Sequence, residues 1–128
     1  MKYLYPNQIR YLHQNIVEVS GGSPGLRDKG LLESAVYRPQ ATFGGKDLYP
    51  DIFSKVAALG HSIIKNHPFL DGNKRTGFEA MRLMLRMNGR DVKASETVKF
   101  QFVLAIATGG LSEEKIAAWL KDRAVKFS

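Results

Sequence analysis

The 128-residue chain contains no cysteine, which excludes disulfide bridges, zinc sites built on thiolates and a cysteine nucleophile. It also lacks a long apolar run. The longest, Phe102 to Ala107, has six residues, far fewer than the roughly 20 needed to cross a bilayer. The N-terminal segment MKYLYPNQIRYLHQN lacks the apolar core of a signal peptide. We therefore expect a cytoplasmic protein that does not span a membrane.

The composition is otherwise that of a globular domain, with 44% hydrophobic and 24% charged residues. A chain of this length supports one hydrophobic core, so we predict a single domain over residues 1–128. Lysine and arginine number 19 against 12 acidic residues, a formal net charge of +7. Such a charge attracts nucleotides, RNA or an acidic protein, and charge alone does not choose among them.

Apolar residues recur at three- and four-residue steps along most of the chain, which predicts an all-α fold, a compact bundle of about six helices. Proline, glycine and capping residues place the helix starts near residues 6, 28, 50, 72, 95 and 112. The segment from Val98 to Ala107 is apolar on nearly every side, which favours a helix at the centre of the bundle. Residues 40–50 hold Gly44 and Gly45 between two short segments, which predicts a small β-hairpin flap.

The joint between the two long helices reads HPFLDGNKRTG and holds most of the residues suited to chemistry. The start of the second long helix exposes unpaired backbone N–H groups over Gly72, Asn73 and Lys74, and such groups bind anions. Gly72 has no side chain to block the approach. Lys74 and Arg75 add positive charges that suit several phosphate oxygens at once. The sequence therefore predicts a phosphate-binding cradle.

Two residues beside this cradle could supply the remaining chemistry. Asp71 offers a carboxylate that could complete the coordination of Mg²⁺ together with nucleotide phosphates and water. His67 carries an imidazole, which could remove a proton from an attacking hydroxyl. A base, a metal ligand and a phosphate cradle are the parts that phosphoryl or nucleotidyl transfer requires.

Each of these residues also has a plainer interpretation. His67 continues an apolar stripe and could be a core histidine, while Asp71 could be only a helix N-cap. Arg75 lies four residues before Glu79, the spacing of a solvent-exposed ion pair. A hydrolytic metal site of His61, His67 and Asp71 is disfavoured, because a proline interrupts the helix and no known zinc-ligand spacing is present. Outside this metal alternative, His61 is given no role, and neither is His13.

The segment HPFLDGNKR resembles the signature of the Fic/Doc family, His-Pro-Phe-x-(Asp/Glu)-Gly-Asn-(Gly/Lys)-Arg, at every fixed position. The segments DKGLLESAVYRPQ and GGKDLYP extend the similarity to the Doc, or death-on-curing, branch over most of the chain. The resemblance implies a compact all-α fold with a flap, here around Gly44 and Gly45, that aligns a segment of the target protein. It also implies ATP as substrate and Mg²⁺ as cofactor.

The resemblance further assigns roles to individual residues. His67 would activate the target hydroxyl, and Asp71 would hold Mg²⁺ and help to orient the base. Phe69 would be a packing anchor. The phosphates would be held by the backbone of residues 72–74 with the Asn73 amide, and Lys74 and Arg75 would offset charge on the transferred group.

Two positions bear on the reaction. AMP-transferring members of the family have Gly after the Asn and a second Arg three positions beyond the first, whereas this sequence has Lys74 and Phe78. By similarity to Doc, a lysine here goes with a reversed nucleotide whose γ-phosphate faces the target. The resemblance thus implies a protein kinase that phosphorylates a Ser or Thr hydroxyl, with adenylylation as the alternative. Elongation factor Tu, the target of Doc, is a hypothesis for this chain, and its phosphorylation would block translation.

Two other classes remain open: a basic RNA-binding module, which lacks a recognisable RNA-binding motif, and an inactive interaction domain. No stretch matches the self-inhibitory pattern (Ser/Thr)-x-x-x-Glu-(Gly/Asn) of some Fic proteins. By resemblance, restraint would come from an antitoxin on another chain, whose acidic tail would suit the basic surface. We expect no membrane partner and no specific nucleic acid.

Overall fold

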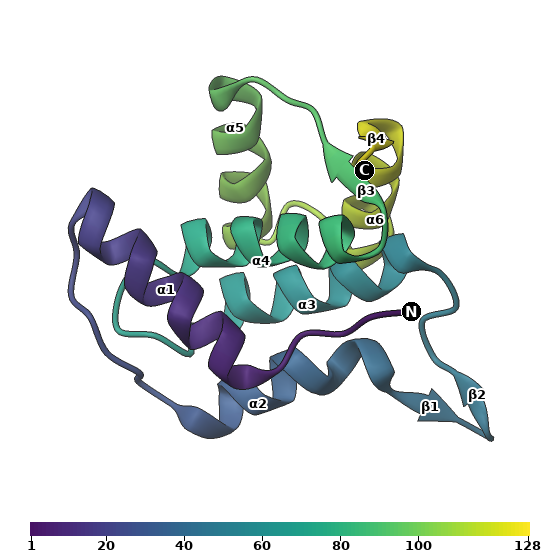
Figure 1. Cartoon of the computed structure of the whole chain (residues 1–128), viewed down its shortest axis with the longest axis horizontal. Helices are drawn as coiled ribbons and strands as arrows, with labels where there is room; N and C mark the ends of the chain where they lie inside the picture. Colours follow the sequence, from purple (N-terminus) through teal and green to yellow (C-terminus); the bar gives the residue numbers. More distant parts are fainter.

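The computed structural model describes residues 1–128 and is mostly helical (Figure 1). Its helices are α1 (Pro6–Ser20), α2 (Lys29–Tyr37), α3 (Ile52–Asn66), α4 (Asn73–Met87), α5 (Glu96–Ala107) and α6 (Glu113–Asp122), with a 3₁₀ turn η1 (Arg38–Gln40) after α2. Two antiparallel pairs join β1 (Thr42–Phe43) to β2 (Lys46–Asp47) and β3 (Arg90–Val92) to β4 (Ala124–Lys126). The predicted six helices and the hairpin within residues 40–50 are confirmed. No helix has the length and apolarity that a membrane span requires.

Side-chain caps explain where several helices begin. Asp28, Asp51, Ser95 and Ser112 each accept a hydrogen bond from the backbone N–H three residues further on. Pro6 occupies the first position of α1, where its fixed φ suits a helix and its missing N–H is not needed. These local signals are visible in the sequence, so the predicted starts of the helices lie close to the observed ones.

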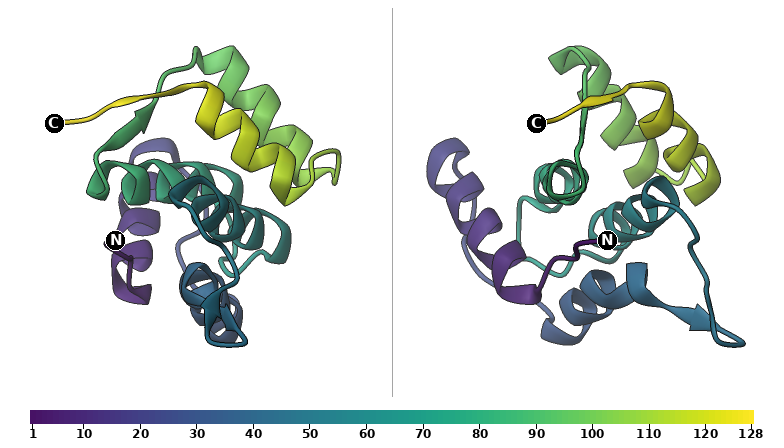
Figure 2. Two further views of the ribbon diagram at one scale, coloured as in Figure 1. Left: turned by 90° about the vertical axis from the view of Figure 1, so that its right-hand side faces the viewer. Right: turned by 45° about the vertical axis from the view of Figure 1, so that its right-hand side comes forward.

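The two long helices α3 and α4 lie side by side across the middle of the molecule (Figures 1 and 2). Glycines bring them into close contact: a Cβ atom on Gly77 of α4 would lie 2.5 Å from Cγ1 of Ile64 on α3. Gly60 of α3 faces Met81 of α4 in the same way. Because the pair is packed this tightly, the end of α3 and the start of α4 are held at a fixed spacing.

Substituting Gly77 by alanine should therefore destabilise the protein. The added methyl group would overlap the fully buried Ile64, and overpacking of this kind typically costs about 1–3 kcal/mol. This exceeds the gain of up to about 1 kcal/mol from the better helix propensity of alanine. Urea unfolding followed by circular dichroism measures the difference, and a more stable Gly77→Ala protein would contradict the close-packing argument.

The prediction that Val98–Ala107 forms the central helix is wrong. That place belongs to α3, which packs against α2, α4, α5 and α6. The corresponding helix, α5, lies at the edge of the molecule and buries one face, while Phe100 on the other face is 66% exposed. An all-round apolar sequence shows that a helix tolerates burial, but the number of neighbours it receives depends on the packing of the whole chain.

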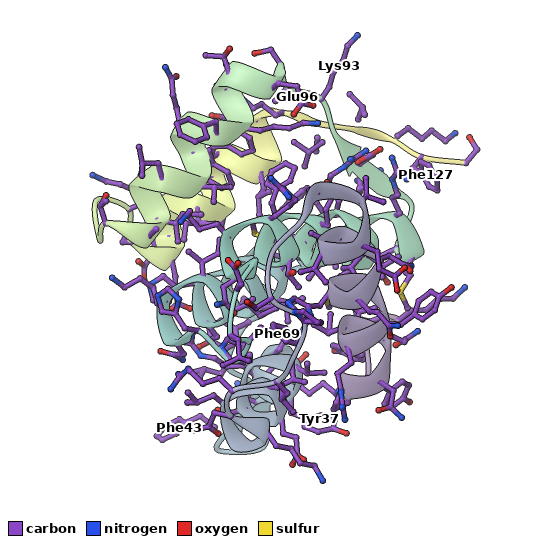
Figure 3. All side chains as sticks on the ribbon, turned by 90° about the vertical axis from the view of Figure 1, so that its left-hand side faces the viewer. Tyr37, Phe43, Phe69, Lys93, Glu96 and Phe127 are labelled. Carbon is purple, nitrogen blue, oxygen red and sulfur yellow. The ribbon has the colours of Figure 1, made fainter.

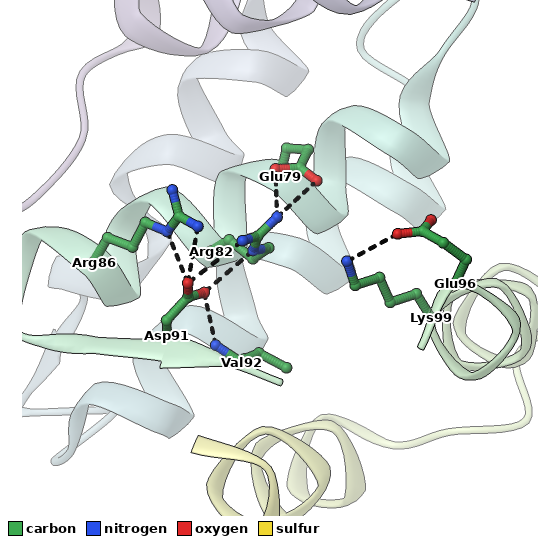
Figure 4. A network of polar contacts seen from close by, with 7 residues as sticks. All are labelled: Glu79, Arg82, Arg86, Asp91, Val92, Glu96 and Lys99. Carbon is green, nitrogen blue, oxygen red and sulfur yellow. Dashed lines mark hydrogen bonds and ion pairs between the residues drawn. The ribbon is translucent and has the colours of Figure 1, made fainter. Parts of the chain in front are cut away.

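A network of ion pairs joins α4 to strand β3 (Figure 4). Asp91 lies 3.2 Å from Nε of Arg82 and 2.8 Å from Nη2 of Arg86, and it also accepts a hydrogen bond from the Val92 N–H. Burial acts to raise the pKa of Asp91, but the hydrogen bonds from Arg82, Arg86 and Val92 outweigh it and lower the pKa from 3.8 to about 2.

This pKa predicts a stability change in acid. Because the folded pKa lies below the unfolded value, the stabilisation is fully present above pH 3.8 and is lost as the pH falls through about 2. At pH 6 the Asp91→Asn variant should be less stable by about 1–2 kcal/mol. At pH 2 the variant and the original chain should differ much less. Urea unfolding at both pH values tests this, and a difference independent of pH would contradict it.

Candidate active site

The turn between α3 and α4 brings six of the predicted site residues together. His67 ends α3 with a left-handed backbone (φ 52°) and is the only non-glycine residue of the chain with a positive φ. Gly72, directly before α4, is also left-handed, with φ 75°. These two reversals place His67 at one end of a tight turn and the N-terminus of α4 at the other.

His67 is exposed, so it is not the core histidine of the plainer interpretation. Its backbone oxygen accepts a hydrogen bond from Nε of Arg27, and its Nδ1 lies 3.4 Å from the side-chain nitrogen of Asn73. No protein atom bonds Nε2, which leaves this nitrogen free to meet an incoming hydroxyl. The weak contact with Asn73 favours the neutral tautomer with the proton on Nε2, so action as a base at Nε2 requires the proton to move to Nδ1.

The buried side chain of Asn73 closes the turn. Its oxygen accepts a hydrogen bond from the N–H of Phe69 at 3.0 Å, and its nitrogen donates to the carbonyl of Phe69 at 2.9 Å. These two backbone partners fix the orientation of the amide. The structure therefore gives this amide a role in shaping the turn, while its contact with phosphate stays a prediction. Phe69 itself is 2% exposed, as expected of a packing anchor.

The start of α4 offers unpaired hydrogen-bond donors. The first backbone bond of the helix runs from the Thr76 N–H to the Gly72 carbonyl, so the N–H groups of residues 73–75 have no partner in the protein. The side chains of Lys74 and Arg75 are exposed and form no ion pair or hydrogen bond. The plainer pairing of Arg75 with Glu79 is not formed, because Glu79 pairs with Arg82 instead. These donors and charges lie where the sequence predicts a phosphate cradle, and the binding of phosphate there stays a prediction.

Asp71 lies beside this cradle with an exposed carboxylate. Its Oδ1 accepts from the Gly72 N–H at 2.8 Å and its Oδ2 from the Ser23 N–H at 3.3 Å. The N-cap position of α4 is occupied by Gly72, so Asp71 is not the cap. One carboxylate beside unpaired N–H groups that can bind phosphate suits Mg²⁺ held jointly with nucleotide phosphates and water. It does not fit a metal site built from protein alone, and no cluster of three His, Cys, Asp or Glu side chains exists that could form one.

The flap residues Gly44 and Gly45 are not part of this cluster. Their hairpin lies near the N-terminal end of α3, where Asp47 pairs with the buried Lys55 at 3.2 Å (Figure 1). The turn follows the other end of α3, and a helix of 15 residues is about 22 Å long. The hairpin itself is confirmed, whereas its docking of a target segment stays a prediction.

Comparison with known proteins agrees with this geometry. The Fic/DOC family profile matches residues 3–85, which include α1 to α3, the turn and most of α4. The chain belongs to the Fic/DOC family. The similarity to this family expected from the signature residues is thus confirmed, and the α5 and α6 helices lie outside the matched segment.

Two relatives of this Fic/DOC chain carry informative names. "Toxin Doc" of Mycolicibacterium smegmatis is 49% identical over 74 residues, and the match covers 58% of this chain and 57% of that protein. "Protein kinase doc" of Escherichia phage P1 is 31% identical over 121 residues, 94% of either chain. The first match spans little more than half of its relative's length, and the second extends over nearly all of both proteins.

Two supports of the Fic/DOC turn were missed from the sequence. Arg27, in the loop between α1 and α2, donates to the backbone oxygens of Asn66 and His67 at 2.7 and 2.6 Å. Cations commonly bind the last carbonyls of a helix, yet nothing near Arg27 in the sequence indicates which helix its side chain contacts. The same loop pairs with the turn through its backbone, for example from the Leu70 N–H to the Gly25 carbonyl.

The second missed residue is His13 of α1. Its Nε2 lies 2.7 Å from the backbone oxygen of Asp71, and its ring stacks on Phe69. Phe69 is labelled in Figure 3. One signal could have indicated its burial: Ile9, His13 and Val17 recur at four-residue steps and form the buried stripe of α1. The stripe predicts that His13 is buried, but not what it contacts.

Proposed function

We propose that this chain is a Doc-like toxin that transfers the γ-phosphate of ATP to a Ser or Thr hydroxyl of a target protein. The observation that carries the proposal is the turn. It holds an exposed imidazole at one end and unpaired N–H groups with two free cations at the other. Phosphoryl transfer depends mainly on positioning and on stabilising charge, and these groups supply both.

The chemistry assigns a step to each residue. In the tautomer that carries its proton on Nδ1, His67 accepts the proton of the target hydroxyl at Nε2 as the hydroxyl oxygen attacks the γ-phosphorus. The bond between that phosphorus and the β–γ bridging oxygen breaks, and ADP leaves. Backbone N–H groups of residues 73–75 and the cations of Lys74 and Arg75 stabilise the charge on the equatorial oxygens. Asp71 would hold Mg²⁺, which supplies charge neutralisation on the phosphates when bound.

A groove between α4 and α5 supports the binding of a nucleotide. It begins at Lys74 and Arg75, runs past Phe78 and Phe100, and has a volume of about 410 Å³. Aromatic side chains next to cations suit the nucleoside and phosphate ends of one ligand. Lys74 at the position after Asn73, and Phe78 where AMP-transferring members have arginine, favour phosphorylation over adenylylation.

The names of the relatives support the same proposal. One is a protein called a toxin and the other a protein called a kinase, and the kinase aligns over nearly the whole chain. For this chain we further propose an antitoxin on another chain as partner, action in the cytoplasm, and elongation factor Tu as the target. Phosphorylation of that factor would block translation.

Two labelled nucleotides test the proposal. The protein is incubated with a bacterial lysate and with ATP labelled at either the γ- or the α-phosphate, and modified proteins are identified by mass spectrometry. We expect label from γ-labelled ATP only, and an acceptor that gains one phosphate. Transfer of the α-label, with an acceptor that gains AMP, would replace the kinase by an adenylyl transferase. Absence of both labels, with RNA binding that falls steeply with salt, would favour the RNA-binding module.

A further inference from the structure

His13 lies in an unusual position for a histidine without a function. It is 3% exposed, and its ring stacks on Phe69 at 3.8 Å between centroids and 6° between planes. Its Nε2 lies 2.7 Å from the backbone oxygen of Asp71, 58 positions further along the chain. An apolar side chain would fill this space without burying a polar ring, so packing alone does not require histidine here.

The hydrogen bond has a defined direction. A carbonyl oxygen only accepts, so Nε2 of His13 must carry the proton and donate it to Asp71. No other group in the protein bonds this carbonyl oxygen. The second ring nitrogen, Nδ1, has no protein partner, and the ring borders a cavity of about 370 Å³ between α1 and residues 22–26. The imidazole is thus held to the turn by one strong hydrogen bond and one stacked face.

The bonded carbonyl belongs to the peptide that joins Asp71 to Gly72. Gly72 has φ 75°, a conformation that glycine permits but does not enforce, because glycine adopts negative φ equally well. A rotation here would move the Asp71 carboxylate relative to the free N–H groups of α4. His13 restrains that rotation, and its Nε2 would lie only 3.6 Å from a Cβ atom placed on Gly72.

We propose that His13 is a positioning residue that holds the Asp71–Gly72 peptide so that the Asp71 carboxylate and the N-terminus of α4 face the same phosphates. The inference rests on the proposed function for its catalytic consequence. The structural part of the inference, that His13 fixes the peptide at the start of α4, does not depend on the proposed function. His13 touches neither the substrate nor the transferred group, and it acts through Asp71.

Two variants and one control separate positioning from packing. His13→Leu removes the donor and keeps an apolar side chain, whereas His13→Gln keeps an N–H donor on a flexible side chain. The control Ile9→Ala shortens a fully buried side chain on the same face of α1, one turn from His13. Three quantities are measured for each protein: the thermal midpoint, the amide NMR shifts of residues 72–74 without ligand, and kcat and KM for ATP with Mg²⁺ per folded molecule.

For His13→Leu we expect kcat/KM to fall by about 10- to 100-fold, the usual effect of losing a group that orients a metal ligand. The amide NMR shifts of residues 72–74 should also change in this variant. His13→Gln should restore most of the loss. Ile9→Ala should lower the thermal midpoint and leave both kcat/KM and these shifts unchanged.

The proposal is overturned if His13→Leu matches the original chain in rate and in amide shifts. It is also overturned if His13→Gln behaves like His13→Leu, since the donor would then be irrelevant. If the original chain transfers no phosphate, the proposed function fails. The amide shifts of the unliganded variants still decide whether His13 holds the turn.

Discussion

Replacing His67 by asparagine should lower the rate of phosphate transfer by about 10²–10⁴-fold, the usual cost of removing a general base. Asparagine is the appropriate replacement because it tolerates the left-handed backbone that residue 67 adopts, so the turn keeps its shape. The His67 side chain is exposed and forms a single polar contact, with Asn73 at 3.4 Å. The thermal midpoint should therefore change little while transfer of γ-label to the acceptor is lost.

The matched control for this variant is His61→Asn on the same helix. His61 faces Glu113 of α6 at 3.8 Å, and burial lowers the pKa of its imidazole. It has no contact with the turn, so transfer should proceed at the original rate. A His67→Asn protein that transfers phosphate as fast as the His61→Asn control would remove His67 from the mechanism.

Replacing Asn73 by alanine should cost stability as well as activity. The substitution leaves the N–H and the carbonyl of Phe69 buried without partners, and each such group typically costs about 1–3 kcal/mol. We expect a total loss of about 2–4 kcal/mol in the free energy of unfolding, measured by urea denaturation. Asn73→Asp should also be destabilised, because one carboxylate oxygen would face the Phe69 carbonyl.

Arg75, two residues after Asn73, provides the contrast. Arg75 is exposed and has no partner in the protein, so Arg75→Ala should change the free energy of unfolding by no more than about 0.5 kcal/mol. It should nevertheless slow phosphate transfer, because a cation beside the transferred group is lost. Equal stabilities of the Asn73→Ala and Arg75→Ala proteins would show that the amide of Asn73 does not hold the turn.

Local chemistry explains what could be predicted from the sequence. Caps such as Asp28 and Ser112 act on their own helices, so the helix starts follow from a few neighbouring residues. The same holds for the turn, where Pro68 and Gly72 limit where one helix ends and the next begins. The signature residues lie within nine positions of one another, which is why the sequence alone is enough to group them.

Contacts between distant segments explain the rest. His13 and Arg27 reach the turn across 58 and 40 positions, and no periodicity or motif connects them to it. The edge position of α5 depends on how six helices share one core, which an apolar pattern alone does not determine. The hairpin could be located in the sequence from Gly44 and Gly45, but its distance from His67 follows from the length and direction of α3.

The supports of the turn have a consequence for truncated forms of this chain. A fragment that begins after residue 28 would contain every residue of the signature, yet it would lack His13, Ser23 and Arg27, which hold Asp71 and His67 in place. Under the proposed function, such a fragment should transfer no phosphate to the target hydroxyl. During synthesis, likewise, residues 13–27 leave the ribosome before the signature does, so these contacts can form only after the signature has emerged.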